Sequence, residues 1–317
     1  MTHHEHIGRL VERLRAGDMR ALARAISLVE NEAAETPALL SACFRQQRQA
    51  LRIGITGAPG AGKSTLVDRM ARAYRQQGRT VGVVAVDPSS PFTGGALLGD
   101  RIRFQEHHGD AGFYARSMAT RGSLGGLALA TADVSLVMEA AGKEILLIET
   151  VGVGQDEVEI ARLADITLLV LVPGMGDDVQ SLKAGVMEIA DLYIVNKADR
   201  EGADRVEQEI RAMQSLGGTA TGWVAPVVRT VGTTGQGVDA LVAEIARAEA
   251  WLAEGDRGKQ RRTMHWQRRL EAMLRAELMR RARSHGVTEA ELDAHARRVV
   301  EGVEDPWALV ERLALSV

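Results

Sequence analysis

The segment from Gly57 to Ser64 brings together residue types that are suited to holding a phosphate chain. It reads Gly-Ala-Pro-Gly-Ala-Gly-Lys-Ser and fits the pattern G-x-x-x-x-G-K-[ST]. Its glycines let the backbone curl so that successive N–H groups point inward at the start of a helix, which forms an anion nest. We expect Lys63 to reach the β and γ phosphates of a nucleotide, and the Ser64 hydroxyl to ligate Mg²⁺. The residues assigned to this site are Gly57, Ala58, Pro59, Gly60, Ala61, Gly62, Lys63, Ser64 and Thr65.

The flanking sequence favours a phosphate site over a glycine-rich turn that binds nothing. An apolar run at residues 51–56 precedes the segment and indicates a buried strand, and a helical pattern at residues 65–77 follows it. A strand, a loop and a helix in this order form the context in which the motif binds phosphate.

The tetrapeptide Asn-Lys-Ala-Asp at residues 196–199 also follows an apolar run and predicts a guanine site. The Asp199 carboxylate can accept hydrogen bonds from guanine N1–H and the 2-amino group, a pair of donors that adenine lacks. Asn196 is expected to brace the loop or contact the base, and the stem of Lys197 to lie against the ring. These residues therefore predict that the nucleotide is GTP or GDP rather than ATP.

A second loop is expected beside the guanine base, because the run at residues 230–235 follows the last apolar strand. The run sits where guanine-nucleotide binders place a loop whose backbone N–H groups meet guanine O6, and Val231 and Gly232 are assigned to this site.

Carboxylates at two further strand ends are candidates for the metal shell. Glu149 ends one apolar run and Asp87 ends another, and such carboxylates can hold Mg²⁺ directly or through water. Asp87 could instead contact an attacking water. Asp100, in the segment after Asp87, is a further metal candidate that could equally cap a helix. Gly152 can bring its N–H onto the γ-phosphate, although the loop could also be a simple turn.

The glycine-rich acidic loop at residues 174–183, which contains Gln180 and Lys183, follows the strand predicted at residues 166–172. From chemistry alone this loop could touch the nucleotide or a partner, or have no function.

Strands that alternate with helices are expected to position these groups. Apolar runs predict strands at residues 51–56, 80–86, 144–150, 166–172, 191–195 and 224–229. The alternation indicates an α/β fold, a three-layer P-loop NTPase domain with a mostly parallel sheet and its ligands at the carboxyl ends of the strands. The expected division is an N-terminal helical segment at 1–50, the nucleotide-binding domain at 51–250 and a C-terminal helical segment at 251–317.

The composition narrows the class of protein. The chain has 317 residues, a formal net charge of −3 and one cysteine, Cys43. We expect no disulfide framework, no nucleic-acid partner, no membrane association and a cytoplasmic location.

Taken together, the motifs closely resemble the family of methylmalonyl-CoA mutase-associated G-proteins, across nearly the whole chain. The matching pieces are GAPGAGKST, VAVDPSSPFTGGALLGDRIR, ETVGVGQDE, GMGDDVQSLK and NKAD. One position departs from the family, since Val231 stands where the base-proximal loop usually carries serine. Recognition of O6 by the backbone is compatible with this change.

The resemblance implies a Mg²⁺-dependent GTPase that acts as a chaperone for an adenosylcobalamin-dependent acyl-CoA mutase, gating cofactor delivery and protecting the mutase from inactivation. It implies a cobalamin adenosyltransferase as a further partner, and a homodimer to which the C-terminal helices contribute. By motif, the metal shell would consist of Ser64, Asp87, Asp100 and Glu149. Gln180 and Lys183 would lie in an additional switch that couples nucleotide state to the mutase. On this basis they are assigned as candidate catalytic residues, together with Lys63 and Asp87.

Two other functions remain open from the residues. A metallochaperone GTPase would need a Cys/His metal site beside the switch, and Cys43 stands alone. The second is a kinase that phosphorylates a small molecule or a transport protein, an old label in this family. Such a kinase would need a base to deprotonate the acceptor hydroxyl, and Asp87 is the candidate for that base.

Overall fold

The computed structural model describes residues 3–45, 49–87, 104–107, 109–119, 126–150, 163–174, 189–217 and 222–315. The chain divides into two compact units, Met1–Arg262 and Thr263–Val317. The division expected at residues 50 and 250 stays a prediction. The three N-terminal helices and the sheet lie in the same compact unit, Met1–Arg262.

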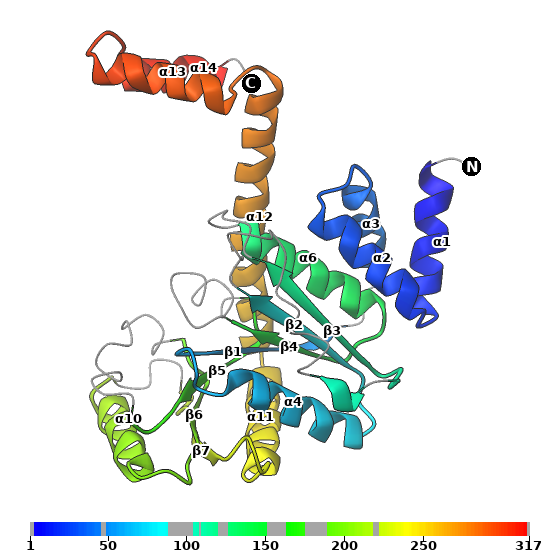
Figure 1. The fold of residues 1–317 in the computed structure, drawn as a ribbon, viewed down its shortest axis with the longest axis vertical. Coiled ribbons are helices and arrows are strands. Elements are labelled where there is room, and N and C mark those ends of the chain that lie inside the picture. The colour runs from blue at the N-terminus through cyan, green and yellow to red at the C-terminus, as the bar shows by residue number, and fades with distance from the viewer. Residues whose placement is uncertain are drawn as a thin grey trace. The chain divides into compact units, whose positions relative to one another are not determined.

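The first unit is built on a parallel sheet, to which the described residues contribute seven strands in the order β3-β2-β4-β1-β5-β6-β7 (Figure 1). β1 lies near the middle, with Ile53 opposite Leu147 of β4 on one side and Ile166 of β5 on the other. The loop after β1 therefore opens at the centre of the carboxyl edge. The strands are β1 (Leu51–Gly57), β2 (Val81–Asp87), β3 (Phe113–Ala119), β4 (Ile145–Glu149), β5 (Ile166–Leu171), β6 (Leu192–Asn196) and β7 (Val227–Thr230).

The predicted α/β fold with a parallel sheet is confirmed, but β3 was missed from the sequence. β3 is an edge strand that pairs only with β2 in the described part of the sheet. Tyr114 and Arg116 are half-buried, and Arg116 pairs with Glu30 of the N-terminal helices. An edge strand that contains a charged residue lacks the continuous apolar run by which central strands are recognised.

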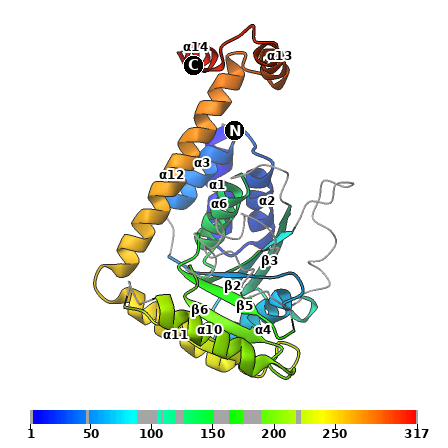
Figure 2. The ribbon, with the colours of Figure 1, turned by 90° about the vertical axis from the view of Figure 1, so that its left-hand side faces the viewer.

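Helices cover both faces of the sheet (Figures 1 and 2). On one face, α4 (Lys63–Gln76) and α11 (Val238–Ala253) pack on the central strands, with Leu66, Met70 and Leu241 completely buried. The other face is covered at one end by α1–α3 and α6, and at the other end by α10. The remaining elements of the unit are α1 (His3–Arg15), α2 (Met19–Glu30), α3 (Thr36–Phe44), α6 (Gly126–Ala140), α10 (Ala203–Gly217) and the 3-10 turn η1 (Gln105–His107).

Side-chain caps set the start of two helices. The Asp18 carboxylate accepts hydrogen bonds from the N–H groups of Arg20 and Ala21 and so begins α2. Thr288 and Glu291 form a capping box at the start of α13 (Glu289–Val300).

The second unit contains most of α12 (Arg257–Ser284), together with α13 (Glu289–Val300) and α14 (Pro306–Leu315). Many of its large apolar side chains are exposed, among them Leu270, Leu274, Val300, Trp307 and Val310. None of the described helices of the chain is both long enough and apolar enough to cross a membrane.

Candidate functional site

The loop between β1 and α4 has a backbone that only glycine suits at two positions. Gly57 has a φ of 141°, and a Cβ there would lie 2.2 Å from the carbonyl oxygen of Val170 in β5. Gly62 has a φ of 87°, and its Cβ would lie 2.5 Å from Nδ2 of Asn196. The loop is therefore pressed against β5 and the end of β6, and α4 begins directly after Gly62.

Lys63 is the first residue of α4 and lies under the loop. Its Nζ donates to the carbonyl oxygens of Gly57 at 2.7 Å and Ala58 at 3.1 Å, and the residue is 5% exposed. The ammonium group is thus held inside the curl, beside the N-terminus of a helix. Both features favour an anion at this point.

Two oxygen-bearing side chains meet beside this helix start. The Ser64 hydroxyl donates to Oε1 of Glu149 at 2.5 Å, and Glu149, at the carboxyl end of β4, is buried. Hydroxyl and carboxylate oxygens are the hard donors that Mg²⁺ prefers. The pair predicted from the sequence is therefore brought together, and its chemistry fits that ion.

Asn196 connects three segments at the end of β6. Its Nδ2 donates to the carbonyl oxygen of Ala61 at 2.8 Å. Its Oδ1 accepts from Thr230 Oγ1 and from the Gly232 N–H, both at 3.1 Å. Asn196 is 2% exposed, so the phosphate loop and the two base loops are fixed to one another through a buried amide.

The other two residues of the predicted base site lie at the surface of the same loop. Lys197 adopts a left-handed conformation, with a φ of 55°, and its Nζ donates to the carbonyl oxygen of Gly60 at 2.8 Å. Its stem therefore spans from the β6 loop to the phosphate loop. Asp199 is exposed, so its carboxylate is open to a ligand.

The loop after β7 is held by internal hydrogen bonds and by a residue that was missed from the sequence. The Val231 N–H donates to the Gln236 carbonyl at 2.9 Å. Arg69 of α4 donates from Nε to Gly232 O at 3.1 Å and from Nη2 to Thr233 O at 2.7 Å. In sequence Arg69 is one of many arginines on helical faces, and no local signal distinguishes it.

Five of the predicted site residues are not located by this geometry. Asp100, Gly152, Gln180 and Lys183 lie outside the described residues. Asp87 ends β2, but its side chain is not among those described. Their roles stay predictions.

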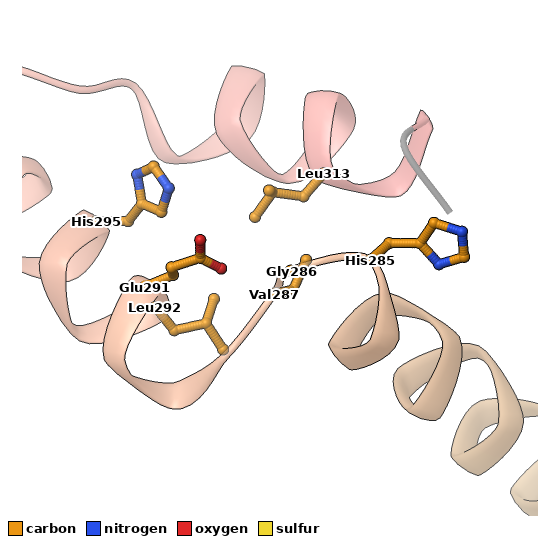
Figure 3. Close-up of a pocket in the computed structure, with 7 residues that line it drawn as sticks. All are labelled: His285, Gly286, Val287, Glu291, Leu292, His295 and Leu313. Carbon is orange, nitrogen blue, oxygen red and sulfur yellow. The ribbon is translucent and has the colours of Figure 1, made fainter.

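The second unit has a small pocket of its own (Figure 3), lined by His285, Gly286, Val287, Glu291, Leu292, His295 and Leu313. Its polar groups already have partners within the unit: His295 Nδ1 lies 2.6 Å from Glu304, and Glu291 accepts the Thr288 N–H at 3.1 Å. We assign no ligand to this pocket.

Comparisons with known proteins identify the family of the chain. The model of the family described as methylmalonyl Co-A mutase-associated GTPase MeaB matches residues 22–286. A protein of Pyrococcus abyssi that is named as a GTPase is 44% identical over 314 residues, which cover 98% of this chain and 97% of that protein. The mitochondrial methylmalonic aciduria type A homolog of Mus musculus is 32% identical over 330 residues, which cover 97% of this chain and 78% of that protein.

Among solved structures, the crystal structure of a LAO/AO transport system kinase is similar, with a TM-score of 0.72 and 26% sequence identity. The similarity covers 97% of this chain and 96% of that one. Fold, site and relatives therefore agree: the chain is a GTPase and belongs to the methylmalonyl-CoA mutase-associated GTPase (MeaB) family.

Proposed function

We propose that this GTPase depends on Mg²⁺ and acts as a chaperone for an adenosylcobalamin-dependent acyl-CoA mutase, with methylmalonyl-CoA mutase as the first candidate. The observation that carries the proposal is the match of residues 22–286 to a family described by its association with that mutase. The name of the mouse relative, a methylmalonic aciduria type A homolog, supports the same link.

The phosphate chain of GTP would be held by the loop from Gly57 to Ser64 and by Lys63. The position of the Lys63 ammonium group supports this assignment, since it is buried within the loop and bonded to Gly57 O and Ala58 O. Transfer of a phosphoryl group to water needs positioning and charge neutralisation more than covalent chemistry, and these groups supply both.

Ser64 and Glu149 are the described residues that would hold Mg²⁺, together with Asp87 and Asp100, which are assigned from their motifs. The oxygen donors of the first two and the 2.5 Å contact between the Ser64 hydroxyl and Glu149 support this assignment. Bound there, the ion would neutralise charge on the β and γ phosphates during hydrolysis.

The base would be read by Asp199, with Asn196 and Lys197 holding the reading loop against the phosphate loop. The buried hydrogen bonds of Asn196 support this arrangement, because they fix the distance between the base and phosphate sites. A fixed distance lets one nucleotide satisfy both sites without a further ordering cost.

The remaining elements of the proposal concern the switch and the partners. Gln180 and Lys183 are proposed to couple nucleotide state to the mutase, with Gly152 contacting the γ-phosphate. The exposed apolar side chains of α12–α14 suit a homodimer contact. A cobalamin adenosyltransferase is the proposed second partner, and the cytoplasm is the proposed location.

The test is GTP hydrolysis by the purified protein with and without candidate adenosylcobalamin mutases, in parallel with Lys63→Ala. We expect one mutase to accelerate phosphate release, and we expect Lys63→Ala to abolish both the basal and the accelerated rate. A protein that hydrolyses GTP at the same rate beside every mutase would contradict the chaperone role while leaving the GTPase intact.

A further inference from the structure

Arg69 holds two consecutive carbonyl groups of the loop after β7. Nε donates to Gly232 O at 3.1 Å and Nη2 donates to Thr233 O at 2.7 Å, so one guanidinium fixes two neighbouring peptide planes. Arg69 is half-buried on α4, one turn after Thr65, whose Cγ2 would lie 3.4 Å from a Cβ at Gly232. Residues four apart share one helix face, so this face of α4 is turned to the loop.

The N–H groups of the same loop are largely committed to partners within the protein. The Val231 N–H donates to Gln236 O at 2.9 Å, and the Gly232 N–H donates to Asn196 Oδ1 at 3.1 Å. Thr234 N–H and Gly235 N–H both donate to Val231 O, at 3.1 and 2.9 Å. Within the described part of the chain, the Thr233 N–H is the donor of this turn for which no acceptor is found.

The carbonyl of Gly232 and the N–H of Thr233 belong to one peptide group. The described peptide bonds are all trans, so this N–H points away from the carbonyl oxygen that Arg69 holds. By fixing Gly232 O and Thr233 O, Arg69 therefore also fixes the direction of the N–H between them. A donor held in advance costs little to order when a ligand arrives.

We propose that Arg69 is a positioning residue for base recognition, which presents the Thr233 N–H as a donor to the exocyclic oxygen at position 6 of guanine. The inference rests on the proposed function, in which Asp199 reads N1–H and the 2-amino group at the neighbouring loop. Asp199 then recognises the two donors of the guanine edge, N1–H and the 2-amino group. The loop held by Arg69 recognises the neighbouring acceptor, the oxygen at position 6.

The test compares binding of GDP, 6-thio-GDP and IDP to the full-length protein by calorimetry. The sulfur of 6-thio-GDP is a weak acceptor at position 6, whereas N1–H and the 2-amino group are kept. IDP keeps the oxygen and lacks the 2-amino group. We expect Arg69→Met to weaken GDP binding by about fivefold, the equivalent of one neutral hydrogen bond. The affinity for 6-thio-GDP should change much less, and the GDP-to-IDP ratio should be unchanged.

Arg72→Met is the matched control, since Arg72 lies on the same helix and pairs with Glu106 instead of the loop. It should leave all three affinities unchanged. Arg69→Lys keeps the charge but cannot hold two carbonyls in a fixed fork, so it should give an intermediate GDP-to-6-thio-GDP ratio. It also provides the measurement if Arg69→Met does not fold.

If the Arg69 variants weakened the binding of GDP and of 6-thio-GDP equally, the inference would be overturned, because a purely structural role of Arg69 would lower both affinities by the same factor. Unchanged binding of all nucleotides would overturn it as well. A wild-type protein that binds IDP as tightly as GDP would instead count against base reading by Asp199, which is a separate failure.

Discussion

The side-chain amide of Asn196 donates to the backbone carbonyl of Ala61 at 2.8 Å, across 135 residues of sequence. This bond joins the end of β6 to the phosphate loop inside a buried site. Because the same amide accepts from Thr230 and Gly232, a single side chain fixes the relative positions of three loops. The base and phosphate sites are thus one rigid arrangement rather than two independent motifs.

Replacing Asn196 with alanine should destabilise the protein even without nucleotide. The change leaves Ala61 O, Thr230 Oγ1 and the Gly232 N–H without their buried partner, and each unmet group costs about 1 kcal/mol or more. We expect the free energy of unfolding to fall by about 2–4 kcal/mol in urea titration. Thr230→Val removes only one of the three bonds and should cost about a third as much. Equal losses in the two variants would contradict the bracing role.

A methyl group at Gly62 should be far more harmful than one at Gly60. Both glycines have positive φ, so alanine at either position is strained by about 1–2 kcal/mol. At Gly62 the added Cβ would also lie 2.5 Å from Asn196 Nδ2, whereas at Gly60 nothing lies within 4 Å. Thermal unfolding of the nucleotide-free variants should therefore show a clearly larger loss for Gly62→Ala. Similar melting temperatures would show that Asn196 can move aside at no cost.

The parts of the site that could be predicted from sequence are those set by local chemistry. The phosphate loop depends on glycines and a lysine within one short segment, and Asn196 and Asp199 lie directly after an apolar strand. The carboxyl ends of parallel strands meet at one edge of the sheet, so the order of strands and motifs along the chain is enough to place such residues together. The pairing of Ser64 with Glu149 follows from the same rule.

The parts that could not be predicted depend on contacts that leave no local signal. Arg69 meets Gly232 across 163 residues of sequence, and its position on α4 looks like any solvated arginine. Asp191 receives both arms of Arg261 from the start of α12, at 2.9 and 2.7 Å. Charged side chains of this kind choose partners only after the backbone has brought the elements together, and many pairings are compatible with the same sequence pattern.

Glu149→Gln should raise the Mg²⁺ concentration that supports nucleotide binding and hydrolysis. The amide keeps the size of the side chain and can still accept from Ser64, but it removes the negative charge that attracts a divalent ion. We expect the half-maximal Mg²⁺ concentration to rise about tenfold or more, equivalent to about 1.4 kcal/mol. Titration of GDP binding against Mg²⁺ measures this directly.

Glu144→Gln is the matched control for this change. Glu144 immediately precedes the first residue of β4, at the end of the strand opposite Glu149, and its carboxylate accepts a hydrogen bond from the Thr80 N–H at 2.9 Å. It should leave the Mg²⁺ requirement unchanged. If both variants behaved alike, the effect of Glu149 would have to be assigned to the net charge of the protein rather than to a metal ligand.

Because Lys143 is buried, we expect the protein's free energy of unfolding to rise as the pH increases above neutrality. It is 4% exposed, and burial lowers the pKa of its ammonium group from 10.5 to about 8. Between pH 8 and 10.5 the unfolded chain therefore binds more protons than the folded one, so this residue contributes increasing stability as pH rises through that window. Below pH 8, folding must bury a charged group whose hydrogen bond to Ala111 O is long, at 3.4 Å.

Lys143→Met removes that cost while keeping most of the side-chain volume. We expect the variant to be about 1–3 kcal/mol more stable than the wild type at pH 7, from the lowered pKa and its conversion to free energy. The advantage should fall to about 1 kcal/mol or less by pH 10, because the folded wild type then carries a neutral lysine and only the cost of deprotonating that lysine remains. Urea unfolding of both proteins at pH 7 and pH 10 measures the difference. A gain of equal size at both pH values would show that packing, rather than the buried charge, determines the contribution of this residue.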